Sequence, residues 1–164
     1  MPRNSFNSSK IDYFWRRECN YMDKAPSFGV IGGGSWATAI VKMLCENLDN
    51  VNWYMRSVYA VEHIKKQDHN PNYLSSVEFN NDQLTLSNDI NEVVEASEFI
   101  IFAIPSAFLK RELDALTIPL HDKVVFSAIK GIVPETSLIV GEHFNQYFDV
   151  PMECIGVLTG PCHA

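Results

Sequence analysis

The stretch that decides the fold of this chain is residues 28–39, Phe28-Gly29-Val30-Ile31-Gly32-Gly33-Gly34-Ser35-Trp36-Ala37-Thr38-Ala39. A short apolar run leads into three glycines, and an amphipathic segment follows as far as Leu48. This order is typical of the strand, tight turn and helix of a dinucleotide-binding βαβ unit. Gly32 allows the turn, and Gly34 lets the backbone approach a pyrophosphate. Ala37 takes the place of the third glycine and is small enough for close helix–strand packing.

The helix that this pattern predicts from Ser35 adds an anion site of its own. The first N–H groups of a helix have no intrahelical acceptor and carry a partial positive charge, which suits a phosphate. Apolar residues recur at helical spacing on one face of this segment, namely Trp36, Ile40, Met43, Leu44 and Leu48. The alternative interpretation is a glycine-rich turn in an α/β protein that binds no ligand. The strand before the glycines and the helix after them favour the nucleotide site.

Farther along the chain, strand-like apolar runs alternate with helical periodicity. Strands are predicted over residues 28–32, 51–55, 99–104, 123–129 and 154–159, with short extended pieces near 77–79 and 84–86. Helices are predicted over residues 35–48, 57–66, 89–95, 106–116 and 137–148. The run at 99–104 is continuously apolar, as in a parallel strand buried on both faces. We therefore expect an α/β fold with a doubly wound parallel sheet of the Rossmann type over residues 25–164, preceded by an extension over residues 1–24.

The bulk composition limits the partners of the chain. Its 164 residues carry a formal net charge of −7, which argues against general nucleic-acid binding because that needs a basic face. No apolar run is long enough to insert into a membrane, and residues 1–24 do not form a secretory signal. Four scattered cysteines favour reduced thiols in a cytoplasmic protein over disulfides. They are Cys19, Cys45, Cys154 and Cys162.

Ligands of such sheets bind at the carboxyl ends of the strands, so the residues just after each strand are the candidates. Arg56 follows the second strand, where residues 51–56 contain no acid to bind an adenosine ribose. A guanidinium there can hold a 2′-phosphate or stack on adenine, so we expect NADPH to be accepted. Lys130 follows a buried strand and can hold a carbonyl or phosphate oxygen. The alternatives are an ordinary solvated arginine and a lysine that merely closes a strand.

Other reactive side chains give weaker signals. The five histidines do not follow a metal-ligand spacing, so no metal site is predicted. Cys162 and His163 are adjacent, and their side chains would diverge; a Cys–His nucleophile pair stays a minor alternative. Trp53, Tyr54 and the aromatic residues of 99–102 are expected in the core.

Six blocks of sequence resemble one known family. They are G-G-G-S-W-A-T-A at 32–39, W-Y-M-R at 53–56, H-N-P-N-Y-L at 69–74, A-I-P-S at 103–106, S-A-I-K-G-I at 127–132 and G-P-C-H-A at 160–164. In this order over about 140 residues they resemble the bacterial NAD(P)-dependent glycerol-3-phosphate dehydrogenases, most of all the Bacteroidetes type. The resemblance implies an oxidoreductase that reduces dihydroxyacetone phosphate to sn-glycerol 3-phosphate with NADPH or NADH, for phospholipid synthesis.

The same resemblance implies roles for particular residues. Those in contact with the cofactor would be Gly32, Gly34, Ser35, Trp36, Arg56, Lys130 and Ala164. Lys130 would also touch the substrate, together with Gly160 and Cys162. The family often has serine at the position of Cys162, so this residue departs from the pattern.

Length is the main departure from the family. Family members continue past residue 164, where they first complete the nucleotide-binding domain and then add a helical domain. Their general acid/base lysine lies in this later part, so the chain resembles their N-terminal portion, with the Rossmann-type domain truncated at its C-terminal end. Lys130 is then the candidate active-site lysine of this portion. The resemblance implies a small-molecule substrate and leaves a homodimer of the full-length protein open. Two alternatives stay open: a non-catalytic nucleotide-binding fragment, and another dehydrogenase of the same superfamily.

Overall fold

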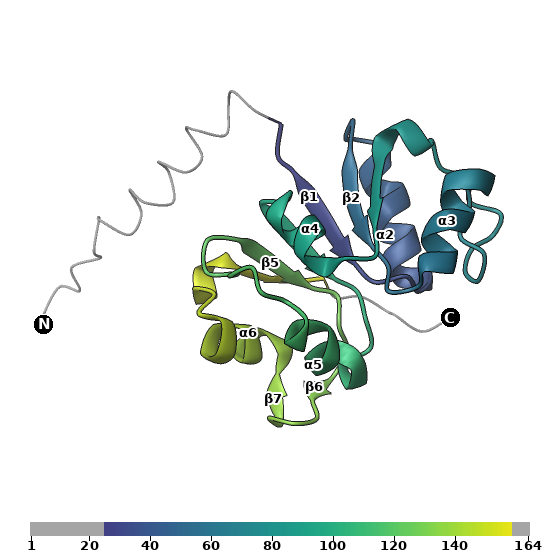
Figure 1. Cartoon of the computed structure of the whole chain (residues 1–164). Helices are drawn as coiled ribbons and strands as arrows, with labels where there is room; N and C mark the ends of the chain where they lie inside the picture. The colour runs from purple at the N-terminus through teal and green to yellow at the C-terminus, as the bar shows by residue number, and fades with distance from the viewer. Residues whose placement is uncertain (1–24, 159–164) are drawn as a thin grey trace, which may run out of the picture.

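The computed structural model describes residues 25–158 and contains a six-stranded parallel sheet in the order β3-β2-β1-β4-β5-β8 (Figure 1). The strands are β1 (Phe28–Ile31), β2 (Val51–Tyr54), β3 (Leu84–Ser87), β4 (Phe99–Phe102), β5 (Val124–Ser127) and β8 (Ile155–Val157). The chain runs outward from β1 to β3 and then returns to place β4 on the other side of β1. This reversal is the topological switch point of a doubly wound sheet, so the predicted Rossmann-type fold is confirmed.

Helices cover both faces of the sheet (Figure 1). On one face lie α2 (Ser35–Cys45) and α3 (Val58–Gln67), and on the other lie α4 (Ile90–Glu95), α5 (Ser106–Asp114) and α6 (Val140–Phe148). Successive residues of a strand point to opposite faces, so Val30 packs with α2 while its neighbour Ile31 packs with α4 and α5. Two apolar layers therefore sandwich the sheet. None of the helices in residues 25–158 has the length and apolarity needed to cross a membrane.

Of the aromatic residues expected in the core, Trp53, Tyr54 and Phe102 lie there, whereas Phe99 is only half-buried. Trp53 and Phe102 are fully buried, and Tyr54 is nearly so. The face of α2 differs from the prediction, because Trp36 and Met43 are exposed while Ala37 and Val41 are buried. The small residues face the sheet because α2 packs close to it just after the glycine turn.

The segment after β5 also differs from the prediction. Residues 137–139 do not begin a helix; β6 (Ile132–Val133) and β7 (Leu138–Ile139) form an antiparallel hairpin, and α6 starts at Val140. Ser137 has a φ of 56°, outside the helical region, and its N–H donates to the carbonyl of Val133 at 2.8 Å. The expected extended piece at 77–79 is only an isolated bridge between His69 and Glu78.

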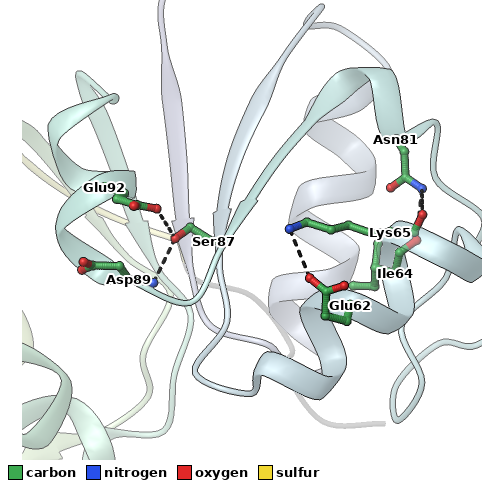
Figure 2. Close-up of polar contacts among 7 residues, drawn as sticks. All are labelled: Glu62, Ile64, Lys65, Asn81, Ser87, Asp89 and Glu92. Atoms are coloured by element: carbon green, nitrogen blue, oxygen red, sulfur yellow. Dashed lines mark hydrogen bonds and ion pairs between the residues drawn. The ribbon is translucent and has the colours of Figure 1, made fainter.

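Polar side chains close the connections around β3. Two short 3-10 helices, Asn81–Gln83 and Met152–Cys154, precede β3 and β8. Figure 2 shows Asn81 reaching the last turn of α3, where its Nδ2 donates to the carbonyl of Ile64 at 3.1 Å. In the same view Ser87 bridges the start of α4: its hydroxyl donates to Glu92 at 2.6 Å and accepts from the N–H of Asp89 at 2.9 Å. These bonds satisfy backbone groups that helix ends leave without partners.

Candidate functional site

The register of the sheet brings the candidate residues to one edge. Ile31 pairs with Tyr54 of β2 and Phe102 of β4, and Phe102 pairs with Ser127 of β5. The strands thus end level with one another, so the residues that follow them leave the sheet at the same edge. These residues are Gly32–Trp36 after β1, Met55–Arg56 after β2, Ala103–Ser106 after β4 and Ala128–Lys130 after β5.

The turn after β1 has the geometry that glycine alone adopts easily. Gly32 has a φ of +138°, and a Cβ there would collide with the carbonyl oxygen of Ala103, the residue just after β4. Gly34 is different: its φ is −80°, and a Cβ on it would meet no atom within 4 Å. The protein itself therefore requires glycine at 32 but not at 34. The open space at Gly34 is where the sequence predicts a pyrophosphate.

All three glycine carbonyls of this turn accept hydrogen bonds from buried side chains. The Trp53 indole N–H donates to the carbonyl of Gly32 at 2.7 Å. Asn70 Nδ2 donates to the carbonyl of Gly33 at 3.1 Å, and the Thr38 hydroxyl to that of Gly34 at 2.8 Å. A carbonyl dipole facing outward would repel an anion. Because all three carbonyls are directed into the protein, the outer surface of the turn is left to N–H groups.

The start of α2 continues this surface. Its N-cap is Gly34, which has no side chain to cap the helix, so the first N–H groups of α2 are available to a ligand. Ser35 and Trp36 are exposed there, and Trp36 has 42% of its surface accessible. The structure thus places both of these predicted cofactor residues beside the turn.

Asn70 is a functional candidate that sequence reasoning did not single out. It is fully buried, and its Nδ2 also donates to the hydroxyl of Thr38 at 2.9 Å. Its Oδ1 accepts from the N–H groups of Asn72 and Tyr73 at 3.0 and 3.2 Å. The block H-N-P-N-Y-L at 69–74 therefore packs against the glycine turn through one amide side chain. The signal in the sequence was the place of Asn70 in this block, one of the six that carry the family resemblance.

Arg56 stands at the end of β2 as expected, and it pairs with a carboxylate that the sequence did not reveal. Its Nη1 lies 3.4 Å from Oε1 of Glu112 on α5, which is buried. The Tyr54 hydroxyl donates to the other oxygen, Oε2, at 2.5 Å. Burial and this hydrogen bond to a carboxylate both raise the pKa of the Tyr54 hydroxyl, so it stays a donor. The signal was an acid on the apolar face of a helix, between Leu109 and Leu113.

Lys130 is exposed and follows β5 within three residues, at the same edge as the glycine turn. Gly131, next to it, has a φ of +91°, which fits a sharp change of direction into the hairpin. Gly160, Cys162 and Ala164 lie outside the described residues, as do the extension at 1–24 and the end of the predicted last strand. Among residues 25–158, His, Cys, Asp and Glu side chains form no cluster of three or more that could hold a metal ion.

Comparisons with known proteins agree with this geometry. Residues 27–164 match the family described as the NAD-dependent glycerol-3-phosphate dehydrogenase N-terminus. A relative named glycerol-3-phosphate dehydrogenase [NAD(P)+] from Pseudomonas syringae is 34% identical over 132 residues, covering 80% of this chain and 38% of its own length. One of the same name from Pseudomonas aeruginosa is 32% identical, covering 85% and 40%.

Solved structures support the fold. A glycerol-3-phosphate dehydrogenase from Plasmodium falciparum superposes with a TM-score of 0.72 at 19% identity, covering 87% of this chain and 43% of that one. One from Coxiella burnetii gives a TM-score of 0.68 at 20% identity, covering 84% and 42%.

The fold and the glycine turn thus define a nucleotide-binding domain of the dehydrogenase class. The chain belongs to the NAD-dependent glycerol-3-phosphate dehydrogenase family, and it matches the N-terminal part of that family. It spans about two fifths of the length of the curated relatives that it matches. The family match favours this assignment over another dehydrogenase of the superfamily, which the sequence had left open.

Proposed function

We propose that this chain binds NADPH or NADH at the turn after β1, as the cofactor-binding part of an enzyme that reduces dihydroxyacetone phosphate to sn-glycerol 3-phosphate. The observation that carries the proposal is the turn itself. Its three carbonyls are held inward by Trp53, Asn70 and Thr38, and the uncapped start of α2 adds further N–H donors. An array of donors with no opposing carbonyl suits a pyrophosphate.

Each predicted residue has a role that follows from its place. Gly34 leaves room for the pyrophosphate, and the N–H groups of Ser35 and Trp36 face it from the start of α2. Arg56 lies at the end of β2, where the adenosine ribose binds in dinucleotide folds. When bound, the nicotinamide supplies the hydride for a carbonyl reduction. Lys130 is the cation that would stabilise the negative charge developing on the carbonyl oxygen of the substrate.

Three residues of the proposed site come from the end of the chain. Gly160 and Cys162 would contact the substrate, and Ala164 would contact the cofactor. Support for these roles is the family match, which extends to residue 164. The thiol of Cys162 is a weaker hydrogen-bond donor than the serine hydroxyl often found there in the family.

The cellular setting is part of the same proposal. We place the protein in the cytoplasm, with a small-molecule substrate and a role in phospholipid synthesis. The net charge of −7 provides no general attraction for nucleic acid. Within the described residues, Cys45 is a buried free thiol, which is compatible with a reducing compartment.

Titration of the chain with NADH and with NADPH, followed by tryptophan fluorescence, tests the cofactor site. Trp36 is partly exposed beside the turn, and the indole of Trp53 donates to the Gly32 carbonyl, so occupancy should change the emission. The proposal predicts saturable quenching by at least one of the two nucleotides. A folded chain with no saturable response to either would contradict it.

A variant at Gly34 separates binding from folding. Gly34→Val should keep the fold, because φ is −80° and the space around a Cβ is open. Its branched side chain should nevertheless weaken nucleotide binding by about a hundredfold or more, by keeping the pyrophosphate away from the N–H groups. The matched control is Ala96→Val, at an exposed position at the end of α4. Equal affinities of the two variants would remove the turn from the site.

A further inference from the structure

Two arginines from distant parts of the sequence meet at a single carboxylate oxygen. Oε1 of Glu112 lies 3.4 Å from Nη1 of Arg56 and 3.3 Å from Nη2 of Arg111. Arg56 follows the end of β2, whereas Arg111 belongs to α5. Both guanidinium groups are therefore held close to each other beside the edge where β2 ends.

The charges of this cluster do not cancel. Two guanidinium groups share one carboxylate, so a net positive charge is left. The arginine side chains are 63% and 57% exposed, while that of Glu112 is 9% exposed. One guanidinium is enough to compensate the buried charge of Glu112, and the second adds a like charge that repels the first. Pairing with the buried carboxylate therefore does not account for the second arginine, and the cluster is suited to a further anion.

The chemistry of the two arginines indicates which anion fits. Each guanidinium carries five N–H donors in a planar fork, and the contact with Glu112 occupies only part of each. Phosphate monoesters carry close to two negative charges and accept such bidentate bonds. A dinucleotide that lies on the glycine turn directs its adenosine ribose to the end of β2. The only phosphate monoester of NADPH is on that ribose.

We propose that Arg111 is a second ligand, with Arg56, for the adenosine 2′-phosphate of NADPH, and that Glu112 is the positioning residue that holds both guanidinium groups. The inference rests on the proposed function, because it places a known part of that cofactor. The Tyr54 hydroxyl donates a hydrogen bond to the other oxygen of Glu112, and this bond fixes the orientation of the carboxylate. The fixed carboxylate reduces the repulsion between the two arginines. It also holds their side chains in place before the ligand binds, so less conformational entropy is lost on binding.

The experiment compares nucleotides that differ only in the 2′-phosphate. Arg111→Ala should weaken NADPH and 2′,5′-ADP by about tenfold, the effect of losing one charge-assisted hydrogen bond. Binding of NADH and 5′-ADP should stay within about twofold. The control is Lys110→Ala, which removes a neighbouring cation that pairs with Asp114 at 2.6 Å. Equal losses of NADPH binding in the two variants would overturn the inference.

Two further variants separate geometry from charge. Arg111→Lys keeps the charge without the planar fork, so it should recover only part of the NADPH affinity. Glu112→Gln keeps the size of the side chain and should lower the ratio of NADPH to NADH affinity. In a chain that already lacks both arginines, Glu112→Gln should leave that ratio unchanged. A ratio that still changes in that chain would show that Glu112 does not act through them.

Failure of Arg111 as a ligand and failure of the cofactor site give different binding results. If the unsubstituted chain binds neither NADH nor NADPH, the proposed function fails. If it binds NADH and NADPH and the Arg111→Ala variant discriminates between them as the unsubstituted chain does, only the second ligand is wrong.

Discussion

The turn after β1 and the segment after β5 leave the sheet at the same edge, but they are held in different ways. In the turn, Gly32 packs against the carbonyl of Ala103, and all three glycine carbonyls are bonded to side chains. In the segment after β5, Lys130 and Gly131 are exposed, and a Cβ on Gly131 would meet no atom within 4 Å. The turn after β1 is thus packed against its neighbours, whereas Lys130 and Gly131 are exposed between the buried Ile129 and Val133.

In the turn after β1, folding and nucleotide binding therefore depend on the same residues. Substitutions in the turn after β1 should alter stability and nucleotide binding together, with Gly34 as the exception already described. Substitution of the exposed Lys130 should alter chemistry while the fold is kept.

The largest expected effect is at Gly32. Gly32→Ala combines a φ of +138° with a collision against the Ala103 carbonyl, so it should lower the free energy of unfolding by about 3 kcal/mol or more. Gly131→Ala is the matched control, because φ there is also positive, at +91°, but no atom is in the way. Its cost should be about 1–2 kcal/mol. Urea denaturation of both variants measures the difference, and equal losses would contradict the packed turn.

The next effect concerns Lys130. In a protein that joins this chain to the remainder of a family member, Lys130→Ala should lower turnover by about a hundredfold, as loss of an oxyanion donor does. In the chain alone it should weaken NADH binding far less, because the turn after β1 is untouched. Steady-state kinetics and fluorescence titration give the two numbers. Near-normal turnover would remove Lys130 from the mechanism, and Lys123→Ala, at the amino end of β5, is the control.

Asn70 tests whether the inward carbonyls matter. Asn70→Ala leaves the Gly33 carbonyl and the Thr38 hydroxyl without their buried partner, which should cost about 2 kcal/mol of stability. Nucleotide affinity should fall as well, because the turn loses one of its fixed carbonyls. The control is the exposed Asn88, whose replacement by alanine should cost less than about 0.5 kcal/mol. If both variants lose the same stability and affinity, the turn is held by other contacts.

The smallest effect is a pH dependence from His143 on α6. Burial lowers the pKa of His143, with Lys110 acting in the same direction and Glu135 opposing it. The unfolded chain therefore takes up a proton at a higher pH than the folded one. Stability from this group is present above the ordinary histidine pKa of about 6.5 and is lost as pH falls below it.

Denaturation at pH 7.5 and at pH 5 measures this loss. His143→Phe should reduce the difference between the two pH values, whereas replacement of the exposed His121 by glutamine should not. An unchanged difference in His143→Phe would show that other groups set the acid sensitivity.

Much of the turn after β1 could be predicted from the sequence, because its signals are local. Gly32, the apolar strand before it and the helix after it lie within a few residues of one another. Apolar runs and the 3.6-residue period likewise predict the other strands and helices. The bonds that hold the turn join residues far apart: Asn70 reaches Gly33 across 37 positions. No periodicity encodes such a bond.

The hairpin after β5 and the arginine cluster could not be predicted from the sequence, for related reasons. The helix predicted from Ser137 begins only at Val140, because the positive φ of Ser137 closes a hairpin between Ile132 and Ile139. In the sequence Glu112 is one charge on a predicted helix. Its hydrogen bond from Tyr54, 58 positions away, is visible only in the structure. Its role depends on the tertiary structure, which brings Glu112 of α5 within reach of Tyr54 and Arg56.

The central claim is that the turn after β1 presents N–H groups to a pyrophosphate, and amide NMR tests it most directly. On addition of NADH, the ¹H–¹⁵N signals of Gly34, Ser35 and Trp36 should show the largest saturable shifts. The N–H of Gly32 should shift less, because it already donates to the carbonyl of Tyr54 at 3.1 Å. Saturable binding that leaves the signals of residues 34–36 unchanged would contradict the account.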